Sequence, residues 1–218
     1  MQFRQTSFRT LDQILIDCAN GVRGRDSYFV DNENVNHSLC LTAEWRICEQ
    51  YLYLRENGIK FFYHFTDARN LDSIGSMGGL YSRRYLHEQN NRHTVYNGSD
   101  ASWSLDQYLG IDDDVHLSFC HRHPMGYRLT QEGHQLVILK ISLDVLTLNC
   151  RFSDRNAVAR GAVYGSGMRG LRNVHLAATQ VQRMRRDHEE FGFRQAEVMV
   201  PRHIPLEMIL NMDNPEFY

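Results

Sequence analysis

The sequence predicts an α+β fold in which a helical part precedes a domain built around strands. Residues 1–58 carry apolar side chains at helical spacing, whereas the runs typical of strands begin at Lys60. The segments between these runs are irregular, so a regular βαβ repeat is not expected. We therefore expect a helical extension over residues 1–58 and a second domain over residues 59–218.

Length and composition indicate an ordinary globular protein. The chain has 218 residues, of which 42% are hydrophobic and 23% are charged, and its formal net charge is −2. A near-neutral chain has no overall electrostatic field that would draw it to nucleic acid or to a membrane.

No apolar run is long enough to span a bilayer, and residues 1–20 lack the apolar stretch of a signal peptide. The five cysteines form no Cys-x-x-Cys pair, so we expect free thiols and a cytoplasmic location.

Two helices are expected in the extension. Thr10-Leu-Asp-Gln13 has the pattern of a capping box and opens a short helix that ends before Gly21. The mostly polar residues 26–38 are expected to form a loop. A second helix runs from about Thr42 to Glu56 and stops at Gly58. The simplest interpretation is that this pair packs on the domain as a lid.

The second domain begins with a strand over Phe61–Thr66. Thr66 or Asp67 then caps a helix that ends at Gly78-Gly79, and another extended piece follows at Leu80–Ser82. Further apolar runs predict strands at Val115–Cys120, Gln135–Ile141, Gln195–Val200 and Met208–Met212.

Basic residues are concentrated in one window. Residues 151–186 contain eight arginines and a single acid, Asp154, and four glycines that predict a mobile loop. Arginine binds phosphate with a planar, two-pronged group, so this window is a candidate phosphate-binding surface. A solvated loop that is balanced by acids elsewhere fits the same pattern. Residues 100–114, for example, carry five aspartates and no base.

The chain lacks several familiar catalytic motifs, including the Gly-x-Gly-x-x-Gly, Walker and His-Glu-x-x-His patterns. His116, Cys120, His121 and His123 lie close enough in sequence to suggest zinc. However, strand alternation places the first two on one face and the last two on the other. No further ligand pair stands at a familiar spacing, so no metal site is expected.

A set of short motifs resembles the DarT family of NAD-dependent DNA ADP-ribosyltransferases, which are toxins of bacterial toxin–antitoxin pairs. The motifs are Tyr63-His64-Phe65-Thr66, Asn70-Leu71, Gly79-Leu80-Tyr81-Ser82, Val115–Met125 and Arg194-Gln195-Ala196-Glu197-Val198. The resemblance covers about residues 60–212 and leaves the N-terminal helices unmatched. It implies the ADP-ribosyltransferase fold, in which two small sheets face each other with NAD in the cleft between them.

The resemblance also implies which residues bind the co-substrate NAD. His64 would hold a ribose hydroxyl, Thr66 would lie near the nicotinamide amide, and Tyr81 would form a stacking wall. The residues assigned to NAD are His64, Phe65, Thr66, Ser73 and Tyr81. Asn70 and Leu71 are expected to fix the helix against the strand instead.

Glu197 is the expected catalytic residue. Cleavage of the nicotinamide–ribose bond leaves an oxocarbenium-like centre, which a nearby carboxylate stabilises. Gln195 and Glu197 are expected to share one strand face and so to reach the same cleft. In several ADP-ribosyltransferases a glutamine at this position contacts the acceptor, and Gln195 is assigned that role.

One motif of the family is missing. Its members carry an arginine before the Val-x-x-x-Phe strand, taken to help deprotonate thymine, but residues 98–103 contain none. Arg92 is the nearest candidate. Otherwise the protein modifies another base, acts on RNA, or uses Glu197 and Gln195 alone.

The leading hypothesis is transfer of ADP-ribose from NAD to a nucleobase of single-stranded DNA or RNA, because a base in a duplex must first be unstacked. The nucleic-acid-binding residues would be Arg155, Arg160, Arg169, Arg172, Arg183, Arg185 and Arg186. An antitoxin protein would be a further partner, and no membrane is expected to be one. The alternatives are an ADP-ribosyltransferase of proteins and a non-catalytic module that binds NAD or nucleic acid.

Overall fold

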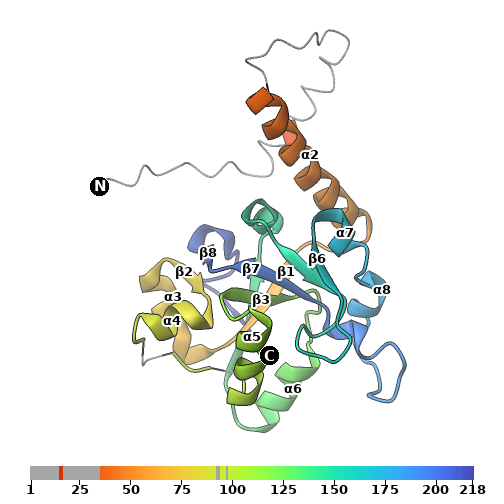
Figure 1. Ribbon diagram of the computed structural model, residues 1–218. Coiled ribbons are helices and arrows are strands. Elements are labelled where there is room, and N and C mark those ends of the chain that lie inside the picture. The colour runs from red at the N-terminus through yellow and green to blue at the C-terminus, as the bar shows by residue number, and fades with distance from the viewer. Residues whose placement is uncertain (1–14, 17–34, 92–93, 97) are drawn as a thin grey trace.

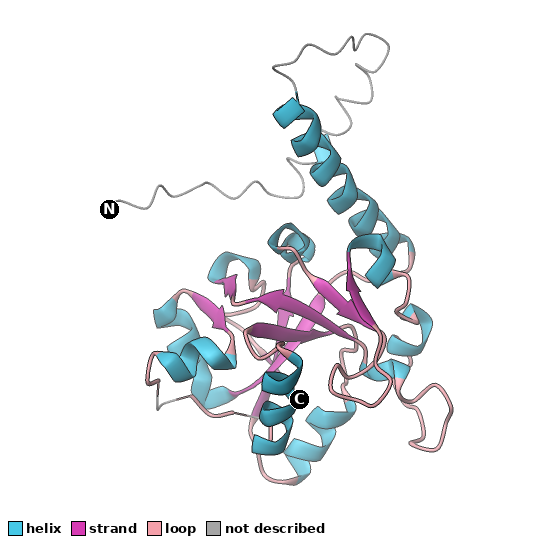
Figure 2. Cartoon of the chain, viewed as in Figure 1, coloured by secondary structure: helices cyan, strands magenta, loops and turns pink. Residues whose placement is uncertain are grey.

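The structure is a computed structural model that describes residues 15–16, 35–91, 94–96 and 98–218. A sheet of seven strands lies at its centre with helices around it, and a second sheet has two strands (Figure 2). The strand order in the large sheet is β6-β5-β7-β3-β1-β4-β9, and every pair is antiparallel. The predicted α+β class is confirmed.

The elements follow one another as labelled in Figure 1. The strands are β1 (Phe62–Asp67), β2 (Gly79–Tyr81), β3 (Asp114–Ser118), β4 (Leu136–Ile141), β5 (Arg151–Ser153), β6 (Tyr164–Ser166), β7 (Glu197–Pro201), β8 (His203–Pro205) and β9 (Glu216–Phe217). The α-helices are α2 (Val35–Glu56), α3 (Leu71–Met77), α4 (Arg83–Glu88), α5 (Asp100–Leu109), α6 (Pro124–Gln131), α7 (Gly167–Leu171) and α8 (Leu176–Thr179). The 3-10 helices are η3 (Ala68–Asn70), η4 (Leu143–Leu148), η5 (Phe193–Gln195) and η6 (Leu206–Met208).

Helix α2 begins earlier than the sequence predicts. Residues 35–38, expected in a loop, are already helical, and they contain no Gly or Pro that would break a helix. At its other end the helix packs against α7 and η4, and Leu54 is fully buried there. The rest of α2 projects away from the domain (Figure 1). The shorter helix expected after Thr10 falls mostly on residues outside the described part of the chain.

The predicted strands over residues 61–66 and 135–141 are confirmed as β1 and β4, which pair along their whole length. Five of the six side chains of β4 are buried, because both faces of this strand are covered. Asp67 ends β1, and its carboxylate accepts a hydrogen bond from the Arg69 amide at 3.0 Å, so it caps η3. Helix α3 then ends at Gly78, whose φ of 79° needs a residue without a Cβ.

The arginine-rich window is not the mobile loop that the sequence predicts. It contains β5, β6, α7 and α8, and β5 pairs with both β6 and β7. Its glycines allow close packing: a Cβ on Gly170 would lie 2.0 Å from the carbonyl oxygen of Gly165. Leu171, Leu176 and Ala178 are buried, so the window forms part of the folded domain.

The prediction of a strand at Met208–Met212 is also wrong. This segment starts with the end of η6 and makes one isolated bridge, between Ile209 and Ile141. The Asn211 side chain accepts a hydrogen bond from the Lys140 amide at 2.7 Å and donates one to the Ile138 carbonyl at 3.0 Å. The Asn211 side chain therefore takes two of the bonds that a neighbouring strand would make with β4, and the Leu210 amide makes a third by donating to the Lys140 carbonyl.

No helix in the described part of the chain combines the length and apolar character needed to cross a bilayer. Cys48, Cys120 and Cys150 are buried, and the last two are free thiols.

Candidate active site

A cavity of about 280 Å³ lies between β1, β3 and β7 on one side and α3, β2, α4 and α5 on the other. The structure brings most of the expected site residues together here. His64, Phe65, Thr66, Ser73, Tyr81 and Glu197 all line this cavity. None of the described side chains of α2 lines the cavity.

Glu197 is the first residue of β7 and is held at both carboxylate oxygens. Asn156 donates a hydrogen bond from Nδ2 to Oε1 at 2.8 Å. The other oxygen, Oε2, lies 2.9 Å from Nδ1 of His116 and 3.4 Å from the amide nitrogen of Ala157. The Glu197 side chain is only 12% exposed. Its position is therefore fixed by groups from β3 and from the loop after β5.

The sheet register explains why His116 reaches Glu197. On the neighbouring strands β3 and β7, Ser118 pairs with Glu197 and His116 pairs with Met199. Side chains two residues apart on a strand share a face, so His116 and Glu197 are diagonal neighbours on the cavity side of the sheet.

His116 is protonated at neutral pH. Its Nδ1 faces Glu197 and its Nε2 lies 3.3 Å from the carbonyl oxygen of Ile111, so both nitrogens face acceptors and both must carry hydrogen. Burial by itself lowers the pKa of His116, but the hydrogen bond and charge of Glu197, helped by Asp106, raise this pKa to about 9. The pair is therefore an imidazolium–carboxylate ion pair at the cavity wall.

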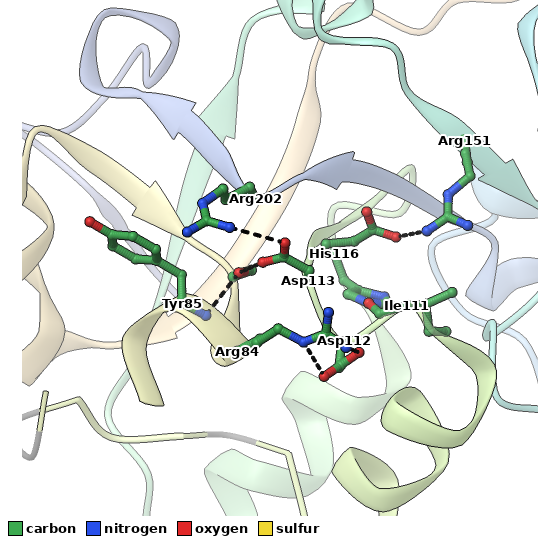
Figure 3. A network of polar contacts seen from close by, with 10 residues as sticks. Arg84, Tyr85, Ile111, Asp112, Asp113, His116, Arg151 and Arg202 are labelled. Carbon is green, nitrogen blue, oxygen red and sulfur yellow. Dashed lines mark hydrogen bonds and ion pairs between the residues drawn. The ribbon is translucent and has the colours of Figure 1, made fainter. Parts of the chain in front are cut away.

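The segment that carries Ile111 is held by ion pairs, several of which Figure 3 shows. Each of the three consecutive aspartates that follow Ile111 has an arginine partner from a different part of the chain. The pairs are Arg84 with Asp112, Arg202 with Asp113 and Arg151 with Asp114. The acidic run singled out in the sequence is thus neutralised, and it fixes the backbone that receives His116.

His64 and Thr66 extend from β1 into the cavity. The Nδ1 atom of His64 lies 3.1 Å from the carbonyl oxygen of His116, and burial lowers the pKa of His64. The Thr66 hydroxyl accepts a hydrogen bond from Asn70 at 2.9 Å. Asn70 also exchanges two hydrogen bonds with the backbone of Val95, at 2.8 and 2.9 Å. Asn70 lines the cavity as well as fixing the chain around it.

Tyr81 cannot be the stacking wall that the resemblance implies. Its ring stacks on Tyr85, with centroids 4.6 Å apart, and on His203, with centroids 4.1 Å apart. Both ring faces are therefore covered, and the Tyr81 hydroxyl donates to the carbonyl of Met77 at 3.3 Å. Only the edge of the ring is available to a ligand.

A charged wall of the cavity was not predicted. Arg83 lines it, with its guanidinium 4.6 Å from the ring centroid of Tyr96 and 4.4 Å from that of Trp103. Asp106 lines the same cavity from α5, and burial raises its pKa to about 6. Arg83 stands on α4 and Asp106 on α5, two helices for which the sequence analysis gave no expectation.

His123 closes another side of the cavity. Burial lowers the pKa of His123 to about 4, so its ring is neutral, and its Nδ1 accepts a hydrogen bond from the Met125 amide at 3.2 Å. His121 instead lies 3.1 Å from Glu216.

In the described residues, no group of three or more His, Cys, Asp or Glu side chains could hold a metal ion.

Gln195 does not share a strand face with Glu197, so that prediction is wrong. It is the last residue of η5, and β7 begins only at Glu197. The turn forms because buried Arg194 donates hydrogen bonds to the carbonyls of Arg122 and Gln182, at 2.8 and 2.6 Å. Gln195 is not among the residues that line the cavity. Arg92 lies outside the described residues.

The seven arginines assigned to nucleic acid have different surroundings. Arg155 is half-buried, pairs with Asp154 at 2.7 Å and covers the Phe193 ring. Arg172 pairs with Glu49 at 3.3 Å and Arg185 with Asp187 at 2.8 Å. The other four are exposed and have no ion-pair partner among the described residues: Arg160, Arg169, Arg183 and Arg186.

Sequence reasoning missed the two side chains that hold Glu197. Asn156 is 41 residues and His116 is 81 residues away from it in the chain. His116 stands in a predicted strand, so its place on a sheet could be expected. Its contact with Glu197 could not, because the sequence does not show that these two strands are neighbours in the sheet.

Comparison with solved structures finds the same fold in ADP-ribosyltransferases. A structure of Thermus sp. 2.9 DarT in complex with ADP-ribosylated ssDNA has a TM-score of 0.59 and 22% identity, covering 70% of this chain and 79% of that chain. The same protein in complex with NAD+ has a TM-score of 0.55 and 22% identity, covering 69% and 79%. Thermosipho africanus DarTG in complex with ADP-ribose has a TM-score of 0.57 and 20% identity, covering 69% and 42%. The predicted ADP-ribosyltransferase fold is confirmed.

The family follows from a match over most of the chain. The model for DarT, described as ssDNA thymidine ADP-ribosyltransferase, matches residues 63–215. The chain therefore belongs to the DarT family, and the resemblance and enzyme class expected from the sequence are confirmed. A search of curated proteins finds no match.

Proposed function

We propose that this protein transfers ADP-ribose from NAD to a nucleobase of single-stranded DNA. The observation that carries the proposal is the fixed carboxylate of Glu197, which faces a cavity also lined by His64 and Thr66. The family description, ssDNA thymidine ADP-ribosyltransferase, supports thymine as the acceptor base. The Thermus relative, seen with NAD+ and with ADP-ribosylated ssDNA, supports the co-substrate and the strand.

The reaction replaces one glycosidic bond by another. The bond between ribose C1′ and the nicotinamide nitrogen breaks, and its electron pair leaves with neutral nicotinamide. Positive charge then develops on the ribose, and the Glu197 carboxylate stabilises it most strongly in the transition state. The acceptor nitrogen attacks C1′ and loses its proton. Asn156 and His116 hold the carboxylate in place, so little reorganisation is needed during the reaction.

NAD occupies the part of the cavity formed by β1, α3 and β2. His64 binds a ribose hydroxyl through Nε2, since its Nδ1 faces the His116 carbonyl. Thr66 lies two residues along the same strand, on the same face, and binds the nicotinamide amide. Phe65, Ser73 and the edge of Tyr81 complete this wall.

The exposed arginines of the 151–186 window bind the phosphates of the acceptor strand. Four of them, Arg160, Arg169, Arg183 and Arg186, have no ion-pair partner among the described residues, so their charge is available to a ligand. Arg155 has a mainly structural role beside Asp154 and Phe193.

The protein acts as a toxin or defence effector that an antitoxin partner restrains. The resemblance to Thermosipho africanus DarTG supports a two-component arrangement, as the chain covers 42% of that protein. Expression of the wild type in bacteria is expected to stop growth, and expression of Glu197→Gln is not. Equal growth of both strains at equal protein levels would contradict this role.

The test of the enzymatic proposal uses labelled NAD with three acceptors in parallel: single-stranded DNA, single-stranded RNA and protein lysate. Label is expected on the DNA, and Glu197→Gln is expected to lower the rate by about 100-fold or more. Glu189→Gln is a matched control, because this glutamate is exposed and lies outside the cavity. Label on RNA or on protein alone would assign a different acceptor. A folded wild type that leaves NAD intact would refute the proposal.

A further inference from the structure

We propose that Asp106 is the general base that removes the proton from the acceptor nucleobase. This inference rests on the proposed function and deepens it, because the transfer of ADP-ribose to a base N–H must release one proton. Asp106 lines the cavity that Glu197 also lines, on the wall formed by α5. It has no hydrogen-bond or ion-pair partner for its side chain among the described residues.

Glu197 is poorly placed to be this base. Its oxygen Oε1 already accepts a hydrogen bond from Asn156, and its oxygen Oε2 faces the protonated His116 and the Ala157 amide. A proton arriving on either oxygen would have to displace one of these donors. The residue is therefore built to keep its charge beside the ribose rather than to collect a proton.

The histidines of the cavity are also unsuitable. His116 already carries both of its ring protons, since each nitrogen faces an acceptor. His123 has a pKa of about 4 because of its burial, which makes it a weak base at neutral pH. His64 also has a pKa lowered by burial, and its Nδ1 lies against the His116 carbonyl. Asp114 lines the cavity too, but its carboxylate is paired with Arg151. Among the described Asp, Glu and His residues of the cavity, Asp106 is the base that remains.

The surroundings of Asp106 suit proton transfer at neutral pH. Burial raises its pKa to about 6, so the carboxylate is ionised at pH 7 but still accepts a proton readily. Four charged groups act on this pKa: His116 on β3 and Arg83 on α4 lower it, while Glu197 on β7 and Asp112 after α5 raise it. Because these charges act in opposite directions, burial remains the largest influence on the pKa of Asp106.

The proposed step balances in atoms and charge. The imide N–H of thymine gives its proton to a carboxylate oxygen of Asp106, and the nitrogen electron pair forms the new bond to ribose C1′. The bond from C1′ to nicotinamide breaks, and its electrons neutralise the pyridinium ring. The products are ADP-ribosylated thymine, nicotinamide and protonated Asp106, which then releases its proton to water.

The test compares wild type and Asp106→Asn in single-turnover transfer to three oligonucleotides that carry thymine, uracil or 5-fluorouracil at the acceptor position. Fluorine makes the imide N–H more acidic, and uracil controls for loss of the methyl group. Loss of a general base is expected to slow transfer to thymine by about 100-fold or more at pH 7.5. Transfer to 5-fluorouracil is expected to slow by only about tenfold or less, because its proton leaves more easily.

Two further readouts separate a catalytic role from a structural one. The wild-type rate on thymine is expected to rise with pH through about 6, where Asp106 loses its proton, and this limb is expected to disappear in Asp106→Asn. NAD affinity, measured by calorimetry, is expected to stay within about threefold of wild type, since the variant changes no group assigned to NAD. Asp72→Asn, at an exposed helix position outside the cavity, is the matched control.

The outcomes are distinct. An Asp106→Asn variant with wild-type rates, or with the same loss on all three bases, would overturn the role of Asp106 while the proposed function stands. An inactive wild type would refute the proposed function and this inference together. If Asp106→Asn does not fold, Asp106→Ser removes the carboxylate with a smaller side chain, and the same comparison of acceptor bases applies.

Discussion

At the scale of single residues, Glu197 depends on two side chains that come from elsewhere in the chain. Asn156 binds one carboxylate oxygen at 2.8 Å and His116 binds the other at 2.9 Å. Catalysis by charge stabilisation requires a carboxylate that is already in position when the ribose becomes positive. Asn156 is a neutral donor to this carboxylate, whereas His116 is a charged one. Single substitutions can therefore separate the effect on catalysis from the effect on the pH dependence of stability.

Asn156→Ala removes the neutral donor to Glu197. A hydrogen bond to a charged group contributes about 1.5–3 kcal/mol, so kcat is expected to fall by about 10- to 100-fold while KM for NAD changes little. Steady-state kinetics measure this, with Asn173→Ala, at an exposed position, as the control. An increase in KM with unchanged kcat would instead place Asn156 in ground-state binding.

His116 gives the folded protein a pH dependence. Glu197 raises the pKa of His116 from 6.5 to about 9, so the ion pair stabilises the fold fully below pH 6.5 and is lost as pH rises through 9. Thermal unfolding is expected to show a larger decrease in Tm between pH 7 and 10 for wild type than for Glu197→Gln. Parallel curves for the two proteins would mean that the pair adds no stability.

Much of the residue-level site could be predicted because its signals are local. His64, Phe65 and Thr66 form one short motif on one strand, and all three line the cavity. The partners of Glu197 could not be predicted in this way, since they meet it only through sheet pairing. Asp106 could not be singled out, because it is one of five aspartates in residues 100–114 and the sequence does not tell which of them reaches the cavity.

At the scale of elements, the arginine-rich window shows how glycine can mislead. Gly165 and Gly170 suggested a mobile loop, yet they lie where β6 and α7 pack against each other. Glycine serves both purposes, since it lacks a Cβ that would strain a loop or fill a close contact. Sequence alone does not distinguish these two uses.

The apolar run at residues 208–212 has strand character, but the Asn211 side chain takes the place of part of the backbone pairing.

Gly170→Ala is expected to destabilise the protein. Alanine gains up to about 1 kcal/mol in a helix interior, but its Cβ would lie 2.0 Å from the Gly165 carbonyl oxygen, and such overpacking costs about 1–3 kcal/mol. Tm is therefore expected to fall by several degrees in calorimetry. Gly192→Ala is the control, since a Cβ there meets nothing within 4 Å. Equal Tm values for the two variants would show that β6 and α7 separate easily.

At the scale of the whole molecule, a formal net charge of −2 hides a strong separation of charge. The acidic run at residues 112–114 is paired internally, whereas several arginines of the 151–186 window are exposed and free of ion pairs among the described residues. An acceptor strand thus meets positive charge that the composition does not reveal.

Affinity for single-stranded DNA is expected to fall steeply with salt. Each phosphate contact contributes about 0.7 to the slope of log K against log salt concentration for a single strand. Replacing Arg169, Arg183 and Arg186 by Gln is expected to reduce this slope by up to about 2 units. Arg128→Gln, on α6 outside the window, is the control. A slope that the triple variant leaves unchanged would place the strand elsewhere.

The central claim is that one cavity breaks NAD and delivers its ADP-ribose to a base of single-stranded DNA. The most direct measurement follows nicotinamide release and oligonucleotide modification in the same reaction, with a thymine-containing strand either alone or in a duplex. The account predicts equal amounts of the two products and much faster reaction on the single strand, because a paired base must first leave the stack. Nicotinamide released without modified DNA, or equal rates on both forms, would contradict it.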